Sequence, residues 1–132
     1  MKRVVIDTNV LIDLFEGNNQ PVGALEVYDG VILPPIVLGE YRAGLFPTER
    51  GREGRRKLDA YLNHSTVEVA PVTDRTAELY AKIFQALRKE GRPIPQNDIW
   101  IAASAMEHGA DLLTADAHFQ AVPMLTVVFP DR

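Results

Sequence analysis

Short apolar runs and longer stretches of mixed polarity alternate along the chain, and this alternation predicts strands and helices in turn. Runs rich in β-branched residues predict strands at residues 4–7, 31–33, 67–70, 112–114 and 126–129. Stretches with helical spacing predict helices at 9–16, 21–29, 35–46, 51–63, 74–90 and 97–108, with a short turn near 117–121. Strands that alternate with helices are typical of βαβ units, so the pattern predicts an α/β fold whose mainly parallel sheet is covered on both faces.

The longest predicted helix, 74–90, has recognisable ends and one apolar face. Thr73 or Asp74 can cap its start, and Gly91 can end it. The apolar positions that follow helical spacing are Ala77, Tyr80, Ala81, Phe84 and Leu87. The stretch 46–54, which contains one proline and two glycines, predicts a flexible connection instead.

Length and composition indicate an ordinary globular protein. The 132 residues favour one domain, and a content of 46% hydrophobic and 24% charged residues is typical of soluble proteins. No apolar stretch approaches the ~18 residues of a membrane span, and the first apolar run meets Asp7 too soon for a signal peptide. The absence of cysteine excludes disulfides and thiolate metal sites and fits a reducing compartment, so we expect a cytoplasmic protein.

Four acidic residues stand where the predicted fold would bring them to one edge of the sheet. Asp7 and Asp116 follow apolar strands, and open α/β sheets bind ligands at the carboxyl ends of their strands. Glu40 lies on a helix that is apolar almost all round and is therefore predicted to be largely buried. Asp98 begins an equally apolar helix. Each residue also has a simpler explanation, which is capping for the three aspartates and a salt bridge to an arginine for Glu40.

The conjunction of the four acids favours a metal site over four separate structural roles. Two carboxylates ~5 Å apart repel by about 3 kcal/mol at an effective dielectric constant of ~20. A divalent cation removes that cost and gives a reason to gather the acids. Ligation by carboxylates and water suits Mg²⁺ or Mn²⁺ better than zinc.

The basic residues are unevenly distributed, although the formal net charge is −4. One group lies within sixteen residues and comprises Arg42, Arg50, Arg52, Arg55, Arg56 and Lys57. The simpler interpretation, which we favour for this group alone, is a solvated helix surface. The functional interpretation is a rim that contacts phosphates and offsets an acidic centre. His118 could also contact a phosphate, but none of the three histidines has the spacing of metal ligands.

Four segments together resemble the PIN domain family, and within it the VapC-type ribonuclease toxins of toxin–antitoxin modules. The segments are 5–12 (VIDTNVLI), Glu40, 97–105 (NDIWIAASA) and 113–119 (LTADAHF). They occur in order over nearly the whole chain, and the length suits a single PIN domain over residues 1–132. The resemblance implies a PIN-like three-layer α/β/α fold with a five-stranded parallel sheet.

The same resemblance implies a function and roles for particular residues. It implies an Mg²⁺- or Mn²⁺-dependent endoribonuclease that hydrolyses RNA phosphodiester bonds, forms a homodimer and is neutralised by a cognate VapB-type antitoxin. The acidic metal-site and catalytic residues would be Asp7, Glu40, Asp98 and Asp116. Their orienting neighbours would be Thr8, Asn9 and Thr114. Asp116 would complete a first metal site or hold a second ion, and the sequence does not decide between one ion and two.

Two other functions fit parts of the sequence. A phosphatase that works through an aspartyl-phosphate would need a second aspartate two residues after Asp7, where the chain has Asn9, and the late strands offer no lysine for a receiver domain. A non-catalytic PIN-like module that binds RNA or protein is the remaining alternative. All four acids are intact, which argues against it, because a degenerate module need not keep them.

Overall fold

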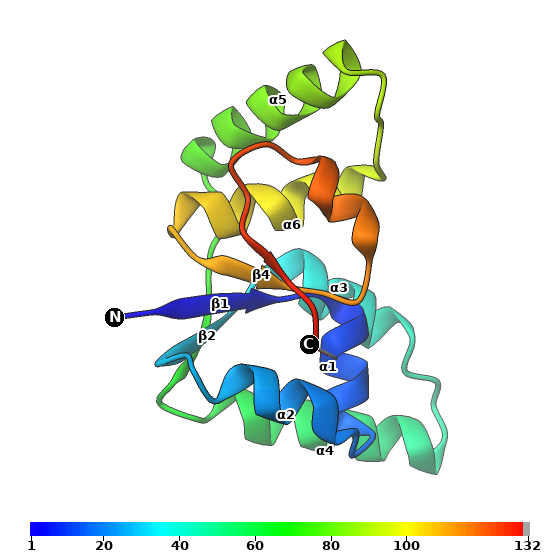
Figure 1. Cartoon of the computed structure of the whole chain (residues 1–132). Helices are drawn as coiled ribbons and strands as arrows, with labels where there is room; N and C mark the ends of the chain where they lie inside the picture. Colours follow the sequence, from blue (N-terminus) through cyan, green and yellow to red (C-terminus); the bar gives the residue numbers. More distant parts are fainter. Residues whose placement is uncertain (131–132) are drawn as a thin grey trace.

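A parallel sheet forms the centre of the molecule, in a computed structural model that describes residues 1–130 (Figure 1). Its strand order is β3-β2-β1-β4-β5, and every neighbouring pair is parallel. The strands are β1 (Arg3–Ile6), β2 (Gly30–Leu33), β3 (Val67–Val69), β4 (Asp111–Leu113) and β5 (Val127–Val128). The predicted five-stranded parallel sheet is confirmed, with each strand within two residues of its expected ends.

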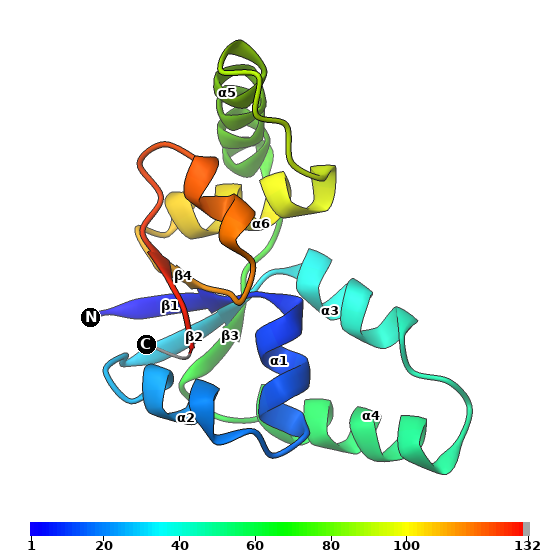
Figure 2. The same cartoon turned by 45° about the vertical axis from the view of Figure 1, so that its right-hand side comes forward.

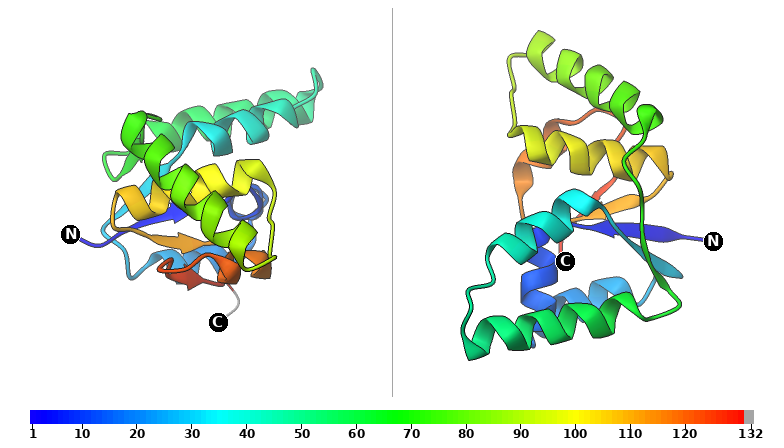
Figure 3. Two further views of the ribbon diagram at one scale, coloured as in Figure 1. Left: turned by 90° about the horizontal axis from the view of Figure 1, so that it is seen from above. Right: turned by 180° about the vertical axis from the view of Figure 1, so that it is seen from behind.

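Helices cover both faces of this sheet, as the sequence pattern predicts. They are α1 (Thr8–Phe15), α2 (Asn19–Leu25), α3 (Pro35–Ala43), α4 (Glu49–Leu62), α5 (Asp74–Lys89) and α6 (Gln96–Glu107), and the 3₁₀ turn η1 spans Ala117–Ala121. Figure 2 shows α6 on one side of the sheet and α1 and α2 on the other, with α5 packed outside α6. Helix α3 contacts both α1 and α6, and Figure 3 shows it beside the carboxyl end of β1. None of the helices among residues 1–130 is both long and apolar enough to cross a bilayer.

The central strand β1 carries the deepest part of the core. Val4, Val5 and Ile6 have no exposed surface, because β1 is paired on both edges and covered on both faces. Ile6 lies opposite Leu113 of β4, and the Asp7 N–H continues the ladder by donating to the Leu113 carbonyl at 3.0 Å. The chain runs from β1 outward to β2 and β3, then returns to β4 and β5 on the other side. Such a reversal of strand order leaves a crevice at the carboxyl ends, here between β1 and β4.

The flexible connection predicted at 46–54 is wrong, because α4 begins within it at Glu49. Thr48 caps this helix and accepts a hydrogen bond from the Gly51 N–H at 3.2 Å. Gly51 is required by close packing rather than by flexibility, since a Cβ there would lie 1.7 Å from the Phe46 carbonyl oxygen. The glycine therefore permits a tight loop between α3 and α4.

The predicted helix and the ends of α5 are confirmed. Thr73 caps the start, and Gly91 follows the end with a φ of +65°. The buried positions are Thr76, Leu79, Ile83 and Leu87, and of these only Leu87 belongs to the apolar set that follows helical spacing in the sequence. Tyr80 instead stacks on Trp100 of α6, with ring centroids 4.3 Å apart. Aromatic contact between two helices thus produces an apolar pattern that does not mark the main core.

Candidate metal centre

Asp7 lies where β1 ends and α1 begins, and both of its carboxylate oxygens accept hydrogen bonds. Oδ1 accepts from the Thr8 N–H at 2.8 Å, and Oδ2 accepts from Thr114 Oγ1 at 2.7 Å and from Asn9 Nδ2 at 3.1 Å. The side chain is only 5% exposed. Burial raises the pKa of the Asp7 carboxyl above its ordinary value; the Thr114 hydrogen bond opposes this rise, and repulsion from Glu40 adds to it.

Thr114 and Asn9 connect the end of β1 to the segment that follows β4. Thr114 Oγ1, besides donating to Asp7, accepts a hydrogen bond from the Asp116 N–H at 3.0 Å. Asn9 Oδ1 accepts from the Ala115 N–H at 3.1 Å. A buried hydrogen bond therefore joins Thr114 to Asp7, 107 positions apart, and fixes the direction of the Asp7 carboxylate.

Glu40 reaches the same edge of the sheet, but its predicted burial is wrong, because its side chain is exposed. It accepts hydrogen bonds from Thr8 Oγ1 at 2.6 Å and from Asn97 Nδ2 at 3.4 Å. Within residues 1–130, Glu40 forms no salt bridge, so the alternative explanation of Glu40 as the partner of an arginine is wrong. Helix α3 buries only Val37 and Tyr41, whereas Ile36 and Leu38 are half-buried against the core. Tyr41 and Glu40 border a groove open to solvent.

Asp98 lies in the first turn of α6 and does not cap that helix. The helix begins at Gln96, three residues earlier than a cap at position 98 would require, and Pro95 precedes it. Asp98 is half-buried. Burial raises the pKa of its carboxyl, the hydrogen bond with His118 opposes the rise, and the negative charges of Asp7 and Glu40 add to it. The raised pKa reflects carboxylates gathered in a site of reduced solvation.

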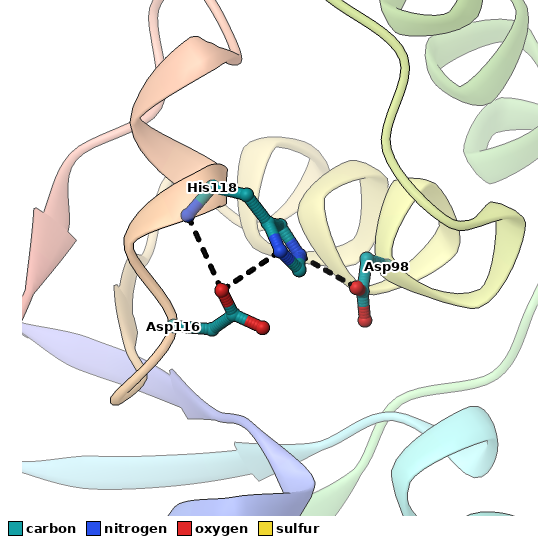
Figure 4. Close-up of side chains that lie close together, drawn as sticks. All are labelled: Asp98, Asp116 and His118. Atoms are coloured by element: carbon teal, nitrogen blue, oxygen red, sulfur yellow. Dashed lines mark hydrogen bonds and ion pairs between the residues drawn. The ribbon is translucent and has the colours of Figure 1, made fainter.

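His118 lies between two of the carboxylates, an arrangement that the sequence pattern did not reveal (Figure 4). Its Nε2 is 2.7 Å from Asp98 Oδ2, and its Nδ1 is 2.7 Å from Asp116 Oδ1. Asp116 also caps η1 by accepting from the His118 N–H at 3.3 Å, so its predicted capping role is confirmed. His118 lies on η1 and reaches Asp98 on α6, so its position depends on how these two elements pack together. The spacing of residues along the sequence does not reveal this contact.

The donor groups at this edge fit a divalent cation. Asp98, Asp116 and His118 each offer a ligand atom, and these atoms lie within 4.8 Å of one another. Asp7 and Glu40 are outside this group of three, but their charges act on Asp98. Oxygen and imidazole donors bind first-row divalent ions, and an ion would relieve the repulsion that raises the carboxyl pKa values.

Most of the basic residues singled out in the sequence already have partners. Arg52 and Arg56 pair with Glu49, Arg56 also pairs with Glu53, and Arg50 pairs with Glu16. Lys57 Nζ donates to the Phe15 carbonyl at the end of α1, at 2.8 Å. Within residues 1–130, Arg42 and Arg55 form no ion pair. Arg50, Arg52 and Arg56 therefore fit the simpler interpretation, in which these residues form a solvated helix surface.

An open groove of about 420 Å³ borders Glu40, between α1, α3 and α4. Apolar side chains line its floor, among them Ile12, Phe15 and Leu45. Phe46 is 72% exposed beside it. An open apolar hollow next to charged groups is a typical docking surface.

Comparison with known proteins supports one family. The PIN domain model matches residues 4–125. Ribonuclease VapC4 of Mycobacterium tuberculosis is 29% identical over 128 residues, which cover 97% of each chain. Ribonuclease VapC5 of the same organism is 30% identical over 118 residues, or 89% of this chain and 86% of that one. The crystal structure of VapBC-5, a member of the VapBC family of toxin–antitoxin systems from M. tuberculosis, superposes with a TM-score of 0.74 at 28% identity and covers 98% of both chains. Both the sequence and the arrangement of the sheet and the helices therefore place this chain in the PIN domain family, among its VapC members.

Proposed function

We propose that this chain is a metal-dependent endoribonuclease and the toxin of a VapBC-type toxin–antitoxin module. The observation that carries the proposal is the convergence of Asp7, Glu40, Asp98 and Asp116 beside the carboxyl ends of β1 and β4. The similarity to proteins named Ribonuclease VapC supports the reaction class. We expect the protein to act in the cytoplasm, on RNA.

The ion would be Mg²⁺ or Mn²⁺, held chiefly by Asp98 and Asp116, with Asp7 and Glu40 completing the negative site. Such an ion, when bound, lowers the pKa of water in contact with it and offsets the charge that builds up on phosphate oxygens. The protein's own contribution is orientation. Thr114 and Asn9 hold Asp7 in one direction, and Thr8 holds Glu40, so no side chain must reorganise when the substrate arrives.

RNA would enter as a single strand or loop, because an extended backbone can lie along a crevice that a duplex cannot enter. Among the basic residues of the predicted rim, Arg42 and Arg55 would contact phosphates, since neither is held in an ion pair within residues 1–130. Arg42 lies two positions after Glu40, on the same helix as the acidic edge. The paired arginines of α4 would have to give up glutamate partners to do the same.

The cognate antitoxin would occupy the groove between α1, α3 and α4 and extend toward Glu40. VapBC-5, a toxin–antitoxin system, supports a partner of this type, and the apolar floor of the groove suits a helix with an apolar face. We also expect a homodimer, as the family resemblance implies.

The test is cleavage of a structured RNA by the chain free of antitoxin, with Mn²⁺, Mg²⁺ or EDTA. We expect metal-dependent cleavage that falls ~100-fold or more in Asp7→Ala and in Asp98→Ala. The matched control is Asp59→Ala, an exposed aspartate on α4, which should cleave like the wild type. Cleavage that persists undiminished in both site variants would point to a contaminating nuclease. RNA binding without cleavage by the wild type would favour the non-catalytic module.

A further inference from the structure

His118 presents its two ring nitrogens to two carboxylates that come from different elements (Figure 4). Nδ1 faces Asp116, two residues earlier in the chain, and Nε2 faces Asp98 on α6. The ring is half-buried, so its orientation is set by these contacts and by packing on Phe119, whose ring centroid lies 4.9 Å away. Two short contacts on opposite sides of one ring fix both its position and its plane.

The Nδ1 contact has the form of a support for a metal ligand. Asp116 Oδ1 accepts both from this nitrogen and from the His118 N–H, so the two residues form one local unit. Histidines that bind metals usually donate their other ring nitrogen to a carboxylate or carbonyl, which orients the ring. In this geometry Nδ1 is the nitrogen that the Asp116 carboxylate supports. Nε2 is the nitrogen that would bind a metal, and it faces Asp98.

The oxygens around Nε2 are arranged to share an ion with it. Within residues 1–130, no hydrogen bond engages Asp98 Oδ1 or Asp116 Oδ2. Octahedral coordination at ~2.1 Å places neighbouring ligand atoms about 3 Å apart. Nε2 and Asp98 Oδ2 are 2.7 Å apart, and because an ionised carboxylate can only accept, the proton between them belongs to Nε2. An ion bound to both atoms would take the place of that proton, which leaves to solvent, and would move the two atoms apart by a few tenths of an ångström.

We propose that His118 Nε2 is a ligand of the metal ion and that it biases the site toward first-row transition ions such as Mn²⁺ over Mg²⁺. This inference rests on the proposed function, which supplies the ion. Mg²⁺ prefers oxygen ligands and retains its waters, whereas an imidazole nitrogen favours transition ions. A site of carboxylates alone would have no such bias. The rival explanation is that the ring merely supplies positive charge between two carboxylates and is displaced when an ion binds.

The experiment measures the affinity of the isolated chain for Mn²⁺ and for Mg²⁺ by calorimetry, together with the electron spin echo spectrum of the Mn²⁺-loaded protein. The first variant is His118→Gln, which places an amide oxygen near the position of Nε2 and makes an all-oxygen site. The second is His118→Asn, which keeps a donor near Nδ1 and offers nothing at Nε2. The control is His108→Gln at the far end of α6, where the ring contacts the Ser104 carbonyl.

We expect the wild type to prefer Mn²⁺ and to show coupling of the manganese to an imidazole nitrogen. Both His118 variants should lose that coupling and bind Mn²⁺ about 10- to 100-fold more weakly. In His118→Gln, Mg²⁺ affinity should change by less than about threefold. The control should match the wild type in every reading.

Unchanged or tighter Mn²⁺ binding in His118→Gln, or a wild-type spectrum without nitrogen coupling, would overturn the inference and leave the nuclease proposal intact. A wild type that binds neither ion would overturn both. A parallel loss of Mn²⁺ and Mg²⁺ affinity would identify His118 as a positioning residue rather than a ligand, and so would also reject the inference.

Discussion

Replacing Thr114 by valine removes one hydroxyl from the candidate site and leaves its shape nearly unchanged. Thr114 is fully buried, donates to Asp7 Oδ2 at 2.7 Å and accepts the Asp116 N–H at 3.0 Å. A hydrogen bond to an ionised carboxylate contributes about 1.5–3 kcal/mol, and a neutral one about 0.5–1.5 kcal/mol. With both bonds lost, T114V should lower the free energy of unfolding by about 3 kcal/mol when Asp7 is ionised.

The same variant should change the titration of Asp7. The hydroxyl favours the ionised carboxylate, so its loss raises further the Asp7 pKa that burial already raises. The folded chain then keeps a proton on Asp7 at pH values where the unfolded chain has released it. Stability consequently falls as pH rises from the ordinary carboxyl pKa to the folded pKa, and levels off above it. The deficit of T114V relative to the wild type should therefore be smallest at low pH.

Urea unfolding in EDTA from about pH 4 to about pH 8 measures the stability deficit, and carboxyl carbon NMR measures the Asp7 pKa. The matched control is T76V. Thr76 is 1% exposed, donates to Glu107 at 2.6 Å and accepts a hydrogen bond from the Thr73 N–H at 3.0 Å. Unlike Thr114, it lies on α5, faces α6 and does not contact Asp7. T76V should lose comparable stability and leave the Asp7 titration unchanged. If Asp7 titrates in T114V as it does in the wild type, the reasoning about its orientation is refuted.

Two glycine predictions and one turn prediction can be checked in the same unfolding assay. Gly51→Ala should cost about 2–3 kcal/mol, because its Cβ would meet the Phe46 carbonyl, whereas Gly39→Ala on α3 meets nothing within 4 Å and should add about 0.5–1 kcal/mol. Equal effects of the two changes would contradict the tight α3–α4 loop. Met124 is 91% exposed with a φ of +69° after Pro123, so Met124→Gly should add about 0.5–1 kcal/mol. Met124→Ala should leave stability unchanged, and a gain as large as that of Met124→Gly would argue against backbone strain.

The sequence predicts the sheet and most helix ends well because these depend on local patterns; the exceptions are α2, which spans Asn19–Leu25 instead of 21–29, and α3, which ends at Ala43 instead of 46. Apolar runs of a few residues mark the strands, and Gly91 ends α5 in the left-handed conformation that glycine adopts without strain. The capping roles of Asp7 and Asp116 are local too, since each accepts from an N–H within two residues. Asp98, although it precedes an apolar run, falls inside the helix because α6 starts at Gln96.

The features that could not be predicted depend on contacts between distant elements. The all-round apolar character of α3 suggested a buried Glu40, but part of that apolar surface borders a groove and the glutamate is exposed. Tyr80 and Phe84 follow helical spacing in the sequence, but that spacing does not reveal that the ring of Tyr80 stacks on Trp100 of α6. His118 reaches Asp98 across twenty positions, a separation that carries no periodic signal. The sequence pattern shows which residues are apolar, but it does not show which part of the fold packs against each of them.

The position of β1 between β2 and β4 has a consequence for the time at which the molecule becomes complete on the ribosome. On one edge of β1, Arg3 pairs with Gly30, which is synthesised only a few tens of residues later. On the other edge, Val4 pairs with Asp111, and Asp7 accepts its hydrogen bond from Thr114, so these contacts form only after most of the chain has been made. At about 5–20 residues per second, synthesis of the intervening chain takes roughly 5–20 seconds. During that interval the nascent polypeptide carries its first carboxylate without the hydroxyl that orients it. The strand order thus delays assembly of the acidic edge until translation is nearly finished. A binding partner synthesised in the same period would be present before that edge is assembled.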